Sequence, residues 1–363
     1  MGEVADRYDN LRIPITASER VPGSTPYYGA NGIQDYVEGF THQGEFVLIA
    51  EDGASDLDNY PTMCINGIIW VNNHAHVIQG RKGITDNHFI AWSIKRCDIK
   101  PMLTGGTRAK LNAEVLMGMR ISTPNHAEQI SIGSFFEHLD SLITLHQRKH
   151  DKLCTVKRSM LDKMFPKPGE TEPEIRFKGF TDPWEQRKLG DMGTTYGGLT
   201  GKSKDDFGHG AAWFVPYTNV FDNPVGDSTR LERVEIDPSQ NVVRRGDALF
   251  TVSSETPEEV GMSSVWPSDL DDLYLNSFCF GYRQDGSFDP SYLAYMLRAD
   301  SFRNQIEMLA QGISRFNISK GKVMEIEVPV PDKREQARIG RLFVDLDSLI
   351  TLHQREPRFA DTG

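Results

Sequence analysis

Two histidines spaced two residues apart are the most direct sign of chemistry in the sequence. His74 and His76 occur in the string WVNNHAHVIQ, and on a β-strand both side chains would lie on one face, where they could bind a metal ion. A zinc site needs further Cys, His or carboxylate ligands, and none stands at a matching spacing nearby. We therefore favour a structural or nucleic-acid-facing role for this pair and predict no metal site.

A second candidate is the glycine-rich string GGLTGKSK at Gly197–Lys204. A phosphate-binding P-loop requires a glycine followed by four residues and then Gly-Lys-Ser, and Tyr196 occupies the place of that first glycine. No clear strand precedes the string and no clear helix follows it. We favour an exposed loop whose Lys202 and Lys204 contact the phosphates of a nucleic acid.

Polar side chains in predicted loops and strand tips could read the edges of base pairs. Arg and Lys suit guanine, whereas Asn and Gln suit adenine. The candidates in the first part of the chain are Asn31, Gln34, Asn72, Asn73, His74, Arg81 and Lys82, and those in the second part are Lys202, Ser203, Lys204, Tyr217, Thr218 and Asn219. Since phosphate contacts usually outnumber base contacts, we expect about a third of them to touch nucleic acid and the rest to be solvated.

We recognise no assembled catalytic set in the sequence, and so we predict a protein that is not itself an enzyme. We find no Asn-Pro-Pro-aromatic string, no Gly-rich strand–loop–helix for a cofactor, no serine elbow and no nuclease carboxylate set. The four cysteines, at positions 64, 97, 154 and 279, form no CxxC pair, which favours reduced thiols in a cytoplasmic protein.

Composition limits the possible partners. The 363 residues carry a net charge of −11, which opposes nucleic-acid binding, because phosphate neutralisation supplies much of that affinity. The charge is uneven, however, and positions 148–167 hold seven Lys or Arg against two Asp. We expect weak, salt-sensitive binding by this chain alone. No long uncharged apolar run is present, so no membrane span is expected, and the start MGEVADRYDN is too polar and acidic for a signal peptide.

The chain contains a long internal repeat. The string LDSLITLHQR occurs at Leu139–Arg148 and again, letter for letter, at Leu346–Arg355, an offset of 207 residues (346 minus 139). Further matches at this offset are Pro124 with Pro331, Glu128-Gln129 with Glu335-Gln336, Ile132-Gly133 with Ile339-Gly340, and Phe136 with Phe343. The period is too long for a solenoid. It predicts that one globular part followed by one helix occurs twice.

Apolar residues in both copies recur at the spacing of one helix face. The first stripe is Ile132, Phe136, Leu139 and Ile143, continued by His146, His150, Leu153, Met160 and Met164, and the second is Ile339, Phe343, Leu346, Ile350 and His353. We predict one helix from about 131 to 165, and a second from about 332 to before Pro357, packed as an antiparallel pair. The predicted seam or partner-contact residues are Phe136, Leu139, Leu142, Ile143, Leu145, Phe343, Leu346, Leu349, Ile350 and Leu352; not all fit one seam, so some are expected to face a partner.

These patterns predict an α+β protein in which two mixed, β-rich domains are joined by two long antiparallel helices with pseudo-two-fold symmetry. The predicted boundaries are a first domain at 1–130, a central helix at 131–166, a connector and second domain at 167–331, a C-terminal helix at 332–357 and a tail at 358–363. Strands are predicted at Phe46–Ala50, within Ile65–Gly80 and at His88–Ile94. The strings at Gly246–Ser254 and Ser277–Arg283 are predicted to match 44–50 and 88–94, and Pro290–Ala310 is predicted to be helical.

The sequence resembles the specificity subunits of type I restriction–modification enzymes over nearly its whole length. The resemblance rests on the duplicated EQ…IG…F…LDSLITLHQR blocks, on KRSMLDKMFPKPGETEPEIRFKGFTDPWEQRKLGD at Lys157–Asp191, and on YYGANGIQDYVEG at Tyr27–Gly39. It implies two target-recognition domains that each read one half of a split, asymmetric site in double-stranded DNA. It also implies conserved helices that bind two modification (methyltransferase) subunits, together with restriction (translocase/endonuclease) subunits.

By the same resemblance, this chain is non-catalytic and holds no cofactor. S-adenosylmethionine for adenine-N6 methylation, and ATP with Mg²⁺, are expected on partner subunits. The alternative that we keep open is a two-headed adaptor, without enzymatic activity, that binds protein or another ligand. The ends depart from the family pattern: residues 1–3 align with 189–191, so no counterpart of 175–188 precedes the first block, and the second helix is expected to be shorter than the first.

Overall fold

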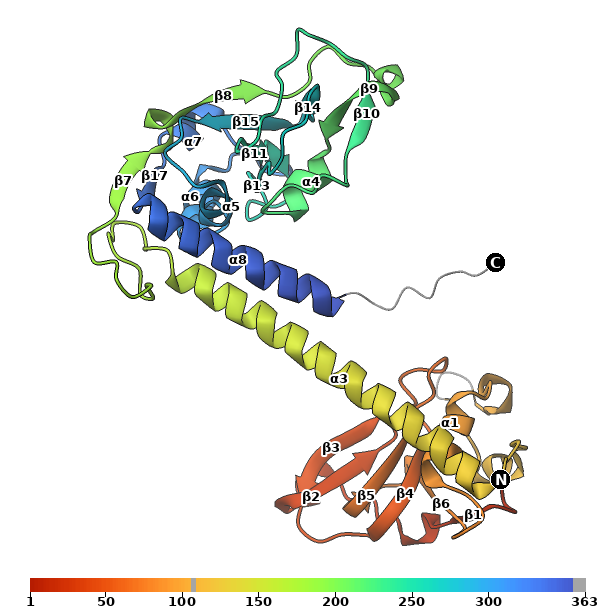
Figure 1. Ribbon diagram of the computed structural model, residues 1–363. Coiled ribbons are helices and arrows are strands. Elements are labelled where there is room, and N and C mark those ends of the chain that lie inside the picture. The colour runs from red at the N-terminus through yellow and green to blue at the C-terminus, as the bar shows by residue number, and fades with distance from the viewer. Residues whose placement is uncertain (106–108, 355–363) are drawn as a thin grey trace. The chain divides into compact units, whose positions relative to one another are not determined.

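The computed structural model describes residues 1–105 and 109–354. The chain forms two compact units, one at Met1–Leu145 and the other at His146–Gly363, called unit 1 and unit 2 below. The predicted tail at 358–363 lies outside the described residues. Each unit is α+β, as predicted (Figure 1).

Unit 1 is built on a six-stranded sheet with the order β1-β6-β4-β5-β2-β3. The strands are β1 (Ala5–Arg7), β2 (Pro22–Gly29), β3 (Gly32–Val37), β4 (His42–Ala50), β5 (Thr62–Val71) and β6 (Ala75–Gly80). The run Phe46–Ala50 is aliphatic or aromatic and fully buried, which explains why β4 is central. The strands predicted at 46–50 and within 65–80 are therefore confirmed.

The strand predicted at His88–Ile94 is wrong, because these residues lie in α1 (Asn87–Lys95). The Asp86 side chain caps this helix by accepting a hydrogen bond from the Phe89 N–H at 2.8 Å. The buried residues Phe89, Ile90 and Ile94 follow a helical spacing rather than an alternating one. The remaining helices of unit 1 are α2 (Ala113–Gly118), the start of α3 (His126–Lys163), and the 3-10 helices η1 (Asp9–Leu11), η2 (Ala17–Glu19) and η3 (Lys100–Met102).

Unit 2 contains a four-stranded sheet, β13-β11-β15-β8, and a three-stranded sheet, β10-β9-β14. Their strands are β8 (Gly193–Gly197), β9 (Phe207–Val215), β10 (Glu232–Val234), β11 (Ala248–Thr251), β13 (Ser263–Val265), β14 (Leu273–Leu275) and β15 (Cys279–Gln284). Two short pairs complete it: β7 (Glu185–Lys188) with β17 (Glu327–Val330), and β12 (Ser253–Ser254) with β16 (Phe316–Asn317). The helices are α4 (Tyr217–Asp222), α5 (Pro290–Met296), α6 (Asp300–Leu309), α7 (Lys320–Met324), α8 (Lys333–Gln354), η4 (Leu189–Asp191) and η5 (Lys204–Asp206).

The two units repeat one topology. The order β1-β6-β4-β5 of unit 1 corresponds to β8-β15-β11-β13 of unit 2, and the parallel pair β2–β5 corresponds to β9–β14. The single strand β5 of unit 1 therefore has two equivalents in unit 2, the short strands β13 and β14. The match of 246–254 to 44–50 is therefore confirmed as β11 and β4. The match of 277–283 to 88–94 is wrong, since β15 takes the place of β6. The helix predicted at 290–310 is present as two helices, α5 and α6.

A glutamine fixes the long helix to the sheet domain in unit 1. The Gln129 side chain accepts a hydrogen bond from the Asp86 N–H (3.2 Å) and donates to the carbonyls of Ile84 (3.1 Å) and Pro124 (2.9 Å). Asp86 is the residue that caps α1. Gln129 is buried, and its amide thereby joins the N-terminal ends of α1 and α3.

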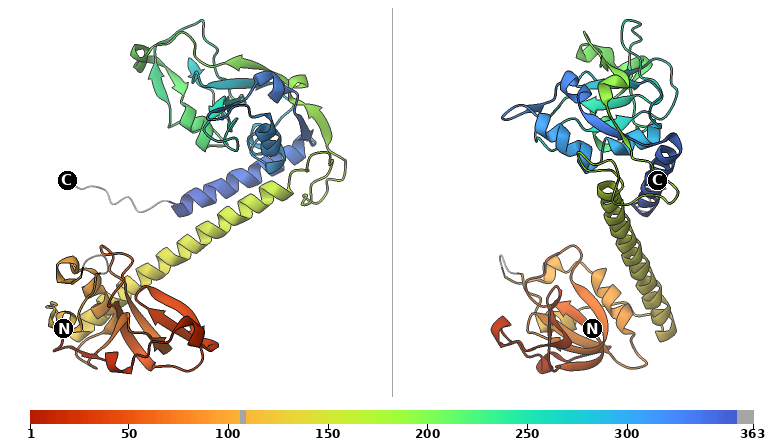
Figure 2. Two further views of the ribbon diagram at one scale, coloured as in Figure 1. Left: turned by 180° about the vertical axis from the view of Figure 1, so that it is seen from behind. Right: turned by 90° about the vertical axis from the view of Figure 1, so that its left-hand side faces the viewer.

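Unit 2 repeats this junction with the second glutamine of the repeat. The Gln336 side chain accepts from the Asp289 N–H (2.7 Å) and donates to the carbonyls of Ser287 (3.2 Å) and Pro331 (2.9 Å). Asp289 caps α5 as Asp86 caps α1. Figures 1 and 2 show α5 against the N-terminal half of α8.

The glycines of the repeated Ile-Gly pair permit this close approach. A Cβ atom at Gly133 would lie 2.7 Å from an Asp86 carboxylate oxygen, and one at Gly340 would lie 2.6 Å from the Tyr292 nitrogen. A larger residue would therefore push the capped helix away. The repeated Gln and Gly residues therefore make the same packing arrangement in both units.

Within unit 2, the second half of α3 lies antiparallel to α8. The His146 and His353 side chains meet, the Lys157 Nζ lies 2.5 Å from an Asp347 carboxylate oxygen, and Phe165 packs on Phe343, so residue numbers rise along one helix as they fall along the other. Figure 2 shows the two helices side by side. The predicted antiparallel pair is confirmed, with helices at 126–163 and 333–354.

The predicted seam residues divide into two groups. Phe343, Leu346 and Ile350 of α8 are buried against unit 2 and α3. The exposed group is Leu139, Leu142, Ile143, Leu145, Leu349 and Leu352, while Phe136 is half-buried against Trp92. The partner of the α8 stripe is the half of α3 that carries Leu153 and Met160. None of the described helices is long and apolar enough to cross a membrane.

Candidate nucleic-acid interface

One end of the unit 1 sheet gathers five of the residues that the sequence singled out. They lie in the β2–β3 hairpin, with Asn31 in its turn and Gln34 in β3, and in the β5–β6 turn. They are Asn31, Gln34, Asn72, Asn73 and His74, together called tip 1. The Asn72 amide donates to the Gln34 side-chain oxygen (3.3 Å) and accepts from the His74 N–H (2.8 Å). The chain thus places two turns that are far apart in sequence next to each other.

Exposure separates the residues of tip 1 by role. Asn72 is only 3% exposed, so its amide shapes the turn. Asn31 donates to the Gly53 carbonyl (2.9 Å) and accepts from the Ser55 N–H (2.8 Å), which holds the loop after β4. Asn31, Gln34 and Asn73 are exposed, and His74 is half-buried beside the Asp52 carboxylate. Exposed amides of this kind can donate to and accept from base edges.

Arg81 and Lys82 lie away from tip 1. They follow the C-terminal end of β6, whereas tip 1 precedes its N-terminal end, about 20 Å away at the usual rise of a strand. Arg81 holds the start of the chain, because its guanidinium donates to the Asp6 carboxylate (3.0 Å) and to the Glu3 carbonyl (2.8 Å). Lys82 is exposed.

Unit 2 forms an equivalent tip around a residue that the sequence reasoning missed. The Asn276 side chain accepts from the Phe278 N–H at 2.8 Å, as Asn72 accepts from His74, and the Asn276 N–H donates to the Val215 carbonyl at the end of β9. We call Asn276, Ser277, Phe278 and Tyr217 tip 2. Phe278 is 59% exposed, and an exposed aromatic ring can stack on a base.

Tyr217 and Asn219 of α4 belong to this end of unit 2 but differ in access. The half-buried Tyr217 donates its hydroxyl to the Ser253 carbonyl at 2.8 Å, whereas neighbouring Thr218 is exposed. Asn219 is fully buried, and its amide donates to the carbonyls of Asp227 and Arg230. Its role is to close the loop after α4, which leaves it no exposed atom for a nucleic acid.

The residues of the P-loop-like string lie at the opposite end of β9 from Tyr217. Lys202 is ion-paired with Asp237 at 3.0 Å. Ser203 donates from its N–H (2.6 Å) and its hydroxyl (2.8 Å) to the Asp206 carboxylate at the start of η5. Hydrogen bonds from Ser239, and then the pairing with Lys202, hold the pKa of Asp237 well below its usual range. Lys204 is exposed. These residues form a surface loop rather than a nucleotide cradle, since the short η5 and then β9 follow them instead of a long helix.

His76 of β6 belongs to a buried charge network in unit 1, whereas His74 lies in the turn before β6 and pairs with Asp52. His76 uses both ring nitrogens, Nδ1 toward an Asp9 carboxylate oxygen (2.7 Å) and Nε2 toward the Leu111 carbonyl (2.8 Å). Glu51 completes the group and pairs with Arg12 (2.6 Å) and Lys110 (2.9 Å). Burial alone would raise the pKa of Asp9, but hydrogen bonds from His76 and the Val77 N–H keep it lowered. With both nitrogens of His76 engaged, this cluster has a structural role.

A second group with metal-binding side chains is Glu45, Cys64 and His88. Burial and the charge of Glu45 raise the pKa of Cys64 far above its usual value, so the thiol stays protonated. A protonated thiol is a poor metal ligand. Neither cluster among the described residues therefore supports a metal-centred reaction.

Comparison with known proteins identifies the family. The family described as "Type I restriction modification DNA specificity domain" matches residues 1–154 and again 181–358. Together the two matches cover most of the chain, and each contains one Gln-Gly junction. The chain belongs to this family.

Individual relatives agree with that assignment. A putative type I restriction enzyme specificity subunit, S.HindORF215P of Haemophilus influenzae, is 44% identical over 142 residues, which is 39% of this chain and 37% of that relative's length. The MjaVIII specificity subunit of Methanocaldococcus jannaschii is 21% identical over 94% of this chain and 84% of its own. The crystal structure of a type I restriction–modification S subunit from M. genitalium has the same fold, with a TM-score of 0.58 at 13% identity, over 97% of this chain and 89% of that one.

Proposed function

We propose that this chain is the DNA-recognition subunit of a type I restriction–modification system and reads a bipartite, asymmetric site in double-stranded DNA. The observation that supports this most directly is that one topology and one Gln-Gly junction occur twice, while the tips differ. Tip 1 presents Asn31, Gln34 and Asn73, whereas tip 2 presents Ser277 and Phe278. Two different tips on equivalent scaffolds would read two different half-sites.

In this proposal the chain performs no chemistry itself. Adenine-N6 methylation from S-adenosylmethionine, and ATP- and Mg²⁺-dependent restriction, take place on modification and restriction subunits. The exposed leucines Leu142, Leu145, Leu349 and Leu352 form equivalent apolar surfaces in the two copies of the repeat, so two copies of one modification subunit can bind them alike. The loop at Lys202–Lys204, which exposes Lys204, would contact phosphates.

Methylation mapping tests the recognition role. The chain is co-expressed with a modification subunit of a type I system in a host that lacks other methylases, and N6-methyladenine is mapped across the genome. We expect one split motif, methylated on both strands and absent without this chain. Loss of the motif's specificity at one half-site in an Asn73→Ala variant would assign tip 1 to that half. A complex that forms but leaves the genome unmethylated would argue against the proposal.

A two-headed adaptor is the second candidate, and the net charge of −11 favours it. An acidic chain is repelled by phosphate, so protein or small-molecule partners would suit it better. Titration of the purified chain with duplex DNA at several salt concentrations separates the two. Binding that weakens steeply with salt and prefers one sequence supports recognition, and binding without either property supports the adaptor.

A further inference from the structure

The internal repeat places a small hairpin beside the tip in each unit. In unit 1, Thr104 and Lys110 exchange two main-chain hydrogen bonds, at 2.9 and 2.8 Å. In unit 2, Gln311 and Asn317 lie 207 positions further along the chain and exchange the same two bonds, at 3.0 and 2.8 Å. We call the segments that these pairs close hairpin 1 and hairpin 2, end residues included. The repeat therefore preserves this feature as well as the Gln-Gly junction.

Main-chain hydrogen bonds connect each hairpin to its tip. In unit 2 the Ile318 N–H donates to the Val252 carbonyl (3.0 Å), and the Val252 N–H donates to the carbonyl of Phe278 in tip 2 (2.9 Å). The equivalent bonds of unit 1, at 2.7 and 2.8 Å, join Leu111, Glu51 and His74 of tip 1 in the same order. Each hairpin therefore lies beside its tip at an equivalent place.

The two hairpins share a glycine, a hydroxyl side chain and an arginine. Their inner strings are GGTRA in hairpin 1 and GISRF in hairpin 2, so Thr107-Arg108 recurs as Ser314-Arg315. The glycine that opens each string has a positive φ, 93° at Gly105 and 145° at Gly312. A Cβ atom at Gly312 would lie 2.0 Å from the Arg315 carbonyl oxygen, so the turn of hairpin 2 requires glycine. Residues 106–108 lie outside the described residues of unit 1.

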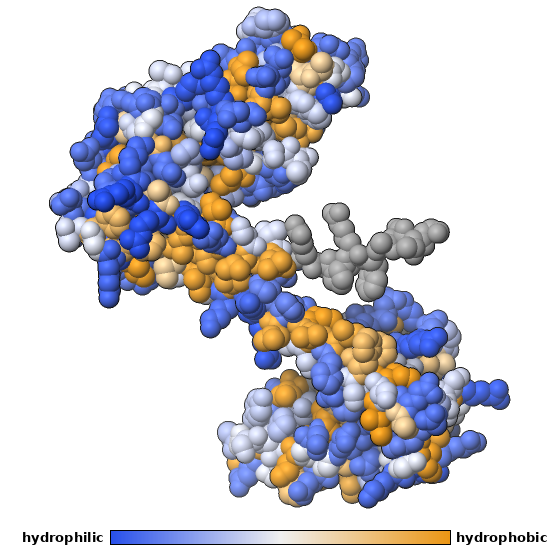
Figure 3. Space-filling view, in the orientation of Figure 1, coloured by the Kyte–Doolittle hydropathy of each residue, from blue (hydrophilic) through white to orange (hydrophobic). Residues whose placement is uncertain are grey.

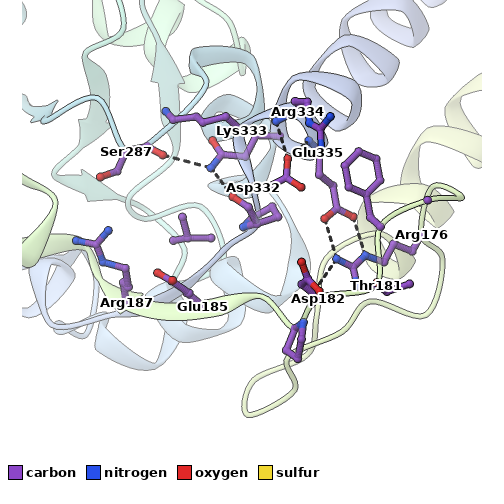
Figure 4. Close-up of a pocket in the computed structure, with 16 residues that line it drawn as sticks. Arg176, Thr181, Asp182, Glu185, Arg187, Ser287, Asp332, Lys333, Arg334 and Glu335 are labelled. Atoms are coloured by element: carbon purple, nitrogen blue, oxygen red, sulfur yellow. Dashed lines mark hydrogen bonds and ion pairs between the residues drawn. The ribbon is translucent and has the colours of Figure 1, made fainter.

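The Arg315 side chain is exposed, and its guanidinium has no partner among the described residues. Other arginines of unit 2 are held by carboxylates. Arg176 donates two hydrogen bonds to Glu335 (2.8 and 2.9 Å), as Figure 4 shows, and Arg283 donates to Asp247 (2.7 Å). The chain has 51 acidic residues against 40 basic ones, and hydrophilic residues cover much of the surface in Figure 3. An arginine without an acidic partner on such a surface is available to an external anion.

Arg315 and tip 2 lie on the same part of unit 2. Strand β16, which ends hairpin 2, pairs with β12, and the Ser253 carbonyl of β12 accepts the Tyr217 hydroxyl of tip 2 at 2.8 Å. Burial raises the pKa of that hydroxyl, and the positive charge of Arg315 opposes the rise, so the two groups are close. Exposed acids follow β12 at positions 255, 258 and 259 and would repel a phosphate. A phosphate contact at this end of unit 2 therefore needs a cation such as Arg315.

We propose that Ser314 and Arg315 form a phosphate-binding site that holds the DNA backbone against tip 2. The proposal rests on the recognition function proposed above. Two half-sites of different base sequence share only their sugars and phosphates. Residues that both units carry at equivalent places are therefore suited to the backbone, whereas residues that differ between the tips are suited to bases. A guanidinium can donate two parallel hydrogen bonds to a phosphate, and a serine hydroxyl can donate another.

Salt-dependent DNA binding tests this site. Anisotropy of fluorescent duplexes is measured with the full-length chain, using one duplex with the split motif from methylation mapping and one of scrambled sequence. Arg315→Ala should lower the salt slope by about one, and should weaken both duplexes by the same factor, roughly tenfold at about 0.1 M salt. Arg315→Lys should keep the slope, because it keeps the charge. Ser314→Ala should weaken both duplexes less and leave the slope unchanged.

Arg341→Ala is the matched control, because it removes an arginine of α8 whose side chain is 83% exposed, and it should change neither slope nor affinity. Circular dichroism establishes that each variant folds. An unchanged slope in Arg315→Ala would overturn the phosphate site. A loss confined to the duplex with the split motif would also overturn it, since Arg315 would then contact a base. If the unaltered chain binds neither duplex, the recognition function fails together with this site.

Discussion

His146 and His353 occupy the same position of the internal repeat, and their Nδ1 atoms lie 3.0 Å apart. A hydrogen bond between two imidazoles needs one ring to donate and the other to accept, so at least one ring must be neutral. The contact between these two repeat-equivalent residues therefore depends on the protonation of their rings.

The pairing of α3 with α8 should weaken in acid. Burial, and then the positive charges of Lys149, His146 and His150, lower the pKa of His353 below its ordinary 6.5. The folded state then binds fewer protons than the unfolded state, so the stability present above pH 6.5 is lost as the pH falls through the folded pKa. Hydrogen exchange of the last turns of α8 should accelerate from pH 7.5 to pH 5.5, after correction for intrinsic rates. His353→Gln should flatten this dependence, and His138→Gln should not.

The buried Glu335 should be far more important for stability than its repeat equivalent. Glu335→Gln leaves the half-buried Arg176 without its carboxylate, and removing one partner of a buried pair costs roughly 3 kcal/mol. Glu128→Gln changes an exposed side chain and should stay within about 0.5 kcal/mol. Urea unfolding measures both. Equal effects at the two positions would contradict the difference in environment.

The glycine of the second junction should tolerate no side chain. Gly340→Ala places a Cβ 2.6 Å from the Tyr292 nitrogen, and overpacking of this kind destabilises by about 1–3 kcal/mol. Gly321→Ala in α7 is the matched control, because its Cβ would lie 3.9 Å from the Ser319 Oγ, and alanine favours a helix by up to about 1 kcal/mol. Thermal unfolding should therefore shift in opposite directions for the two variants.

At the proposed DNA interface, salt dependence should distinguish residues that contact phosphates from residues that contact bases. Lys204→Ala removes an exposed cation and should lower the salt slope of binding by about one while preserving sequence preference. Phe278→Ala removes an exposed ring of tip 2 and should weaken binding with little change in slope. Fluorescence titrations across salt concentrations measure both slopes. An unchanged slope for Lys204→Ala would remove that residue from the phosphate contacts.

The parts of the fold that could be predicted are those whose apolar residues recur at a regular spacing over a long stretch of sequence. The stripe from Ile132 to Met164 predicted α3 because helical spacing persists over many turns. The apolar run His88–Ile94 was too short to separate helix from strand, and only the cap at Asp86 decides it. The site was harder to predict, because Asn276 and Tyr217 follow the ends of two strands, β14 and β9, whose parallel pairing no local sequence pattern indicates. A comparison of the Asn-x-His and Asn-x-Phe strings could have suggested the second tip.

Burial also corrected the reading of single residues. The sequence suggests that Asn72 and Asn219 contact bases, because asparagine suits adenine, yet both side chains are buried and shape loops. Asparagine is as common in turns as in interfaces, since its side chain hydrogen-bonds its own backbone. Which of the two roles applies depends on packing that a single sequence does not display.

The Gln-Gly junction that fixes each sheet domain to its helix affects how readily one sheet domain could be exchanged for another. Gln129 and Gln336 hold main-chain groups at the start of α1 and α5, so the junction depends little on which side chains the domain carries. A sheet domain with a capped helix of this shape could therefore replace another without redesign of the long helix. Each sheet domain could in this respect be exchanged for another of the same shape, and new combinations of domains could arise by recombination at the repeat.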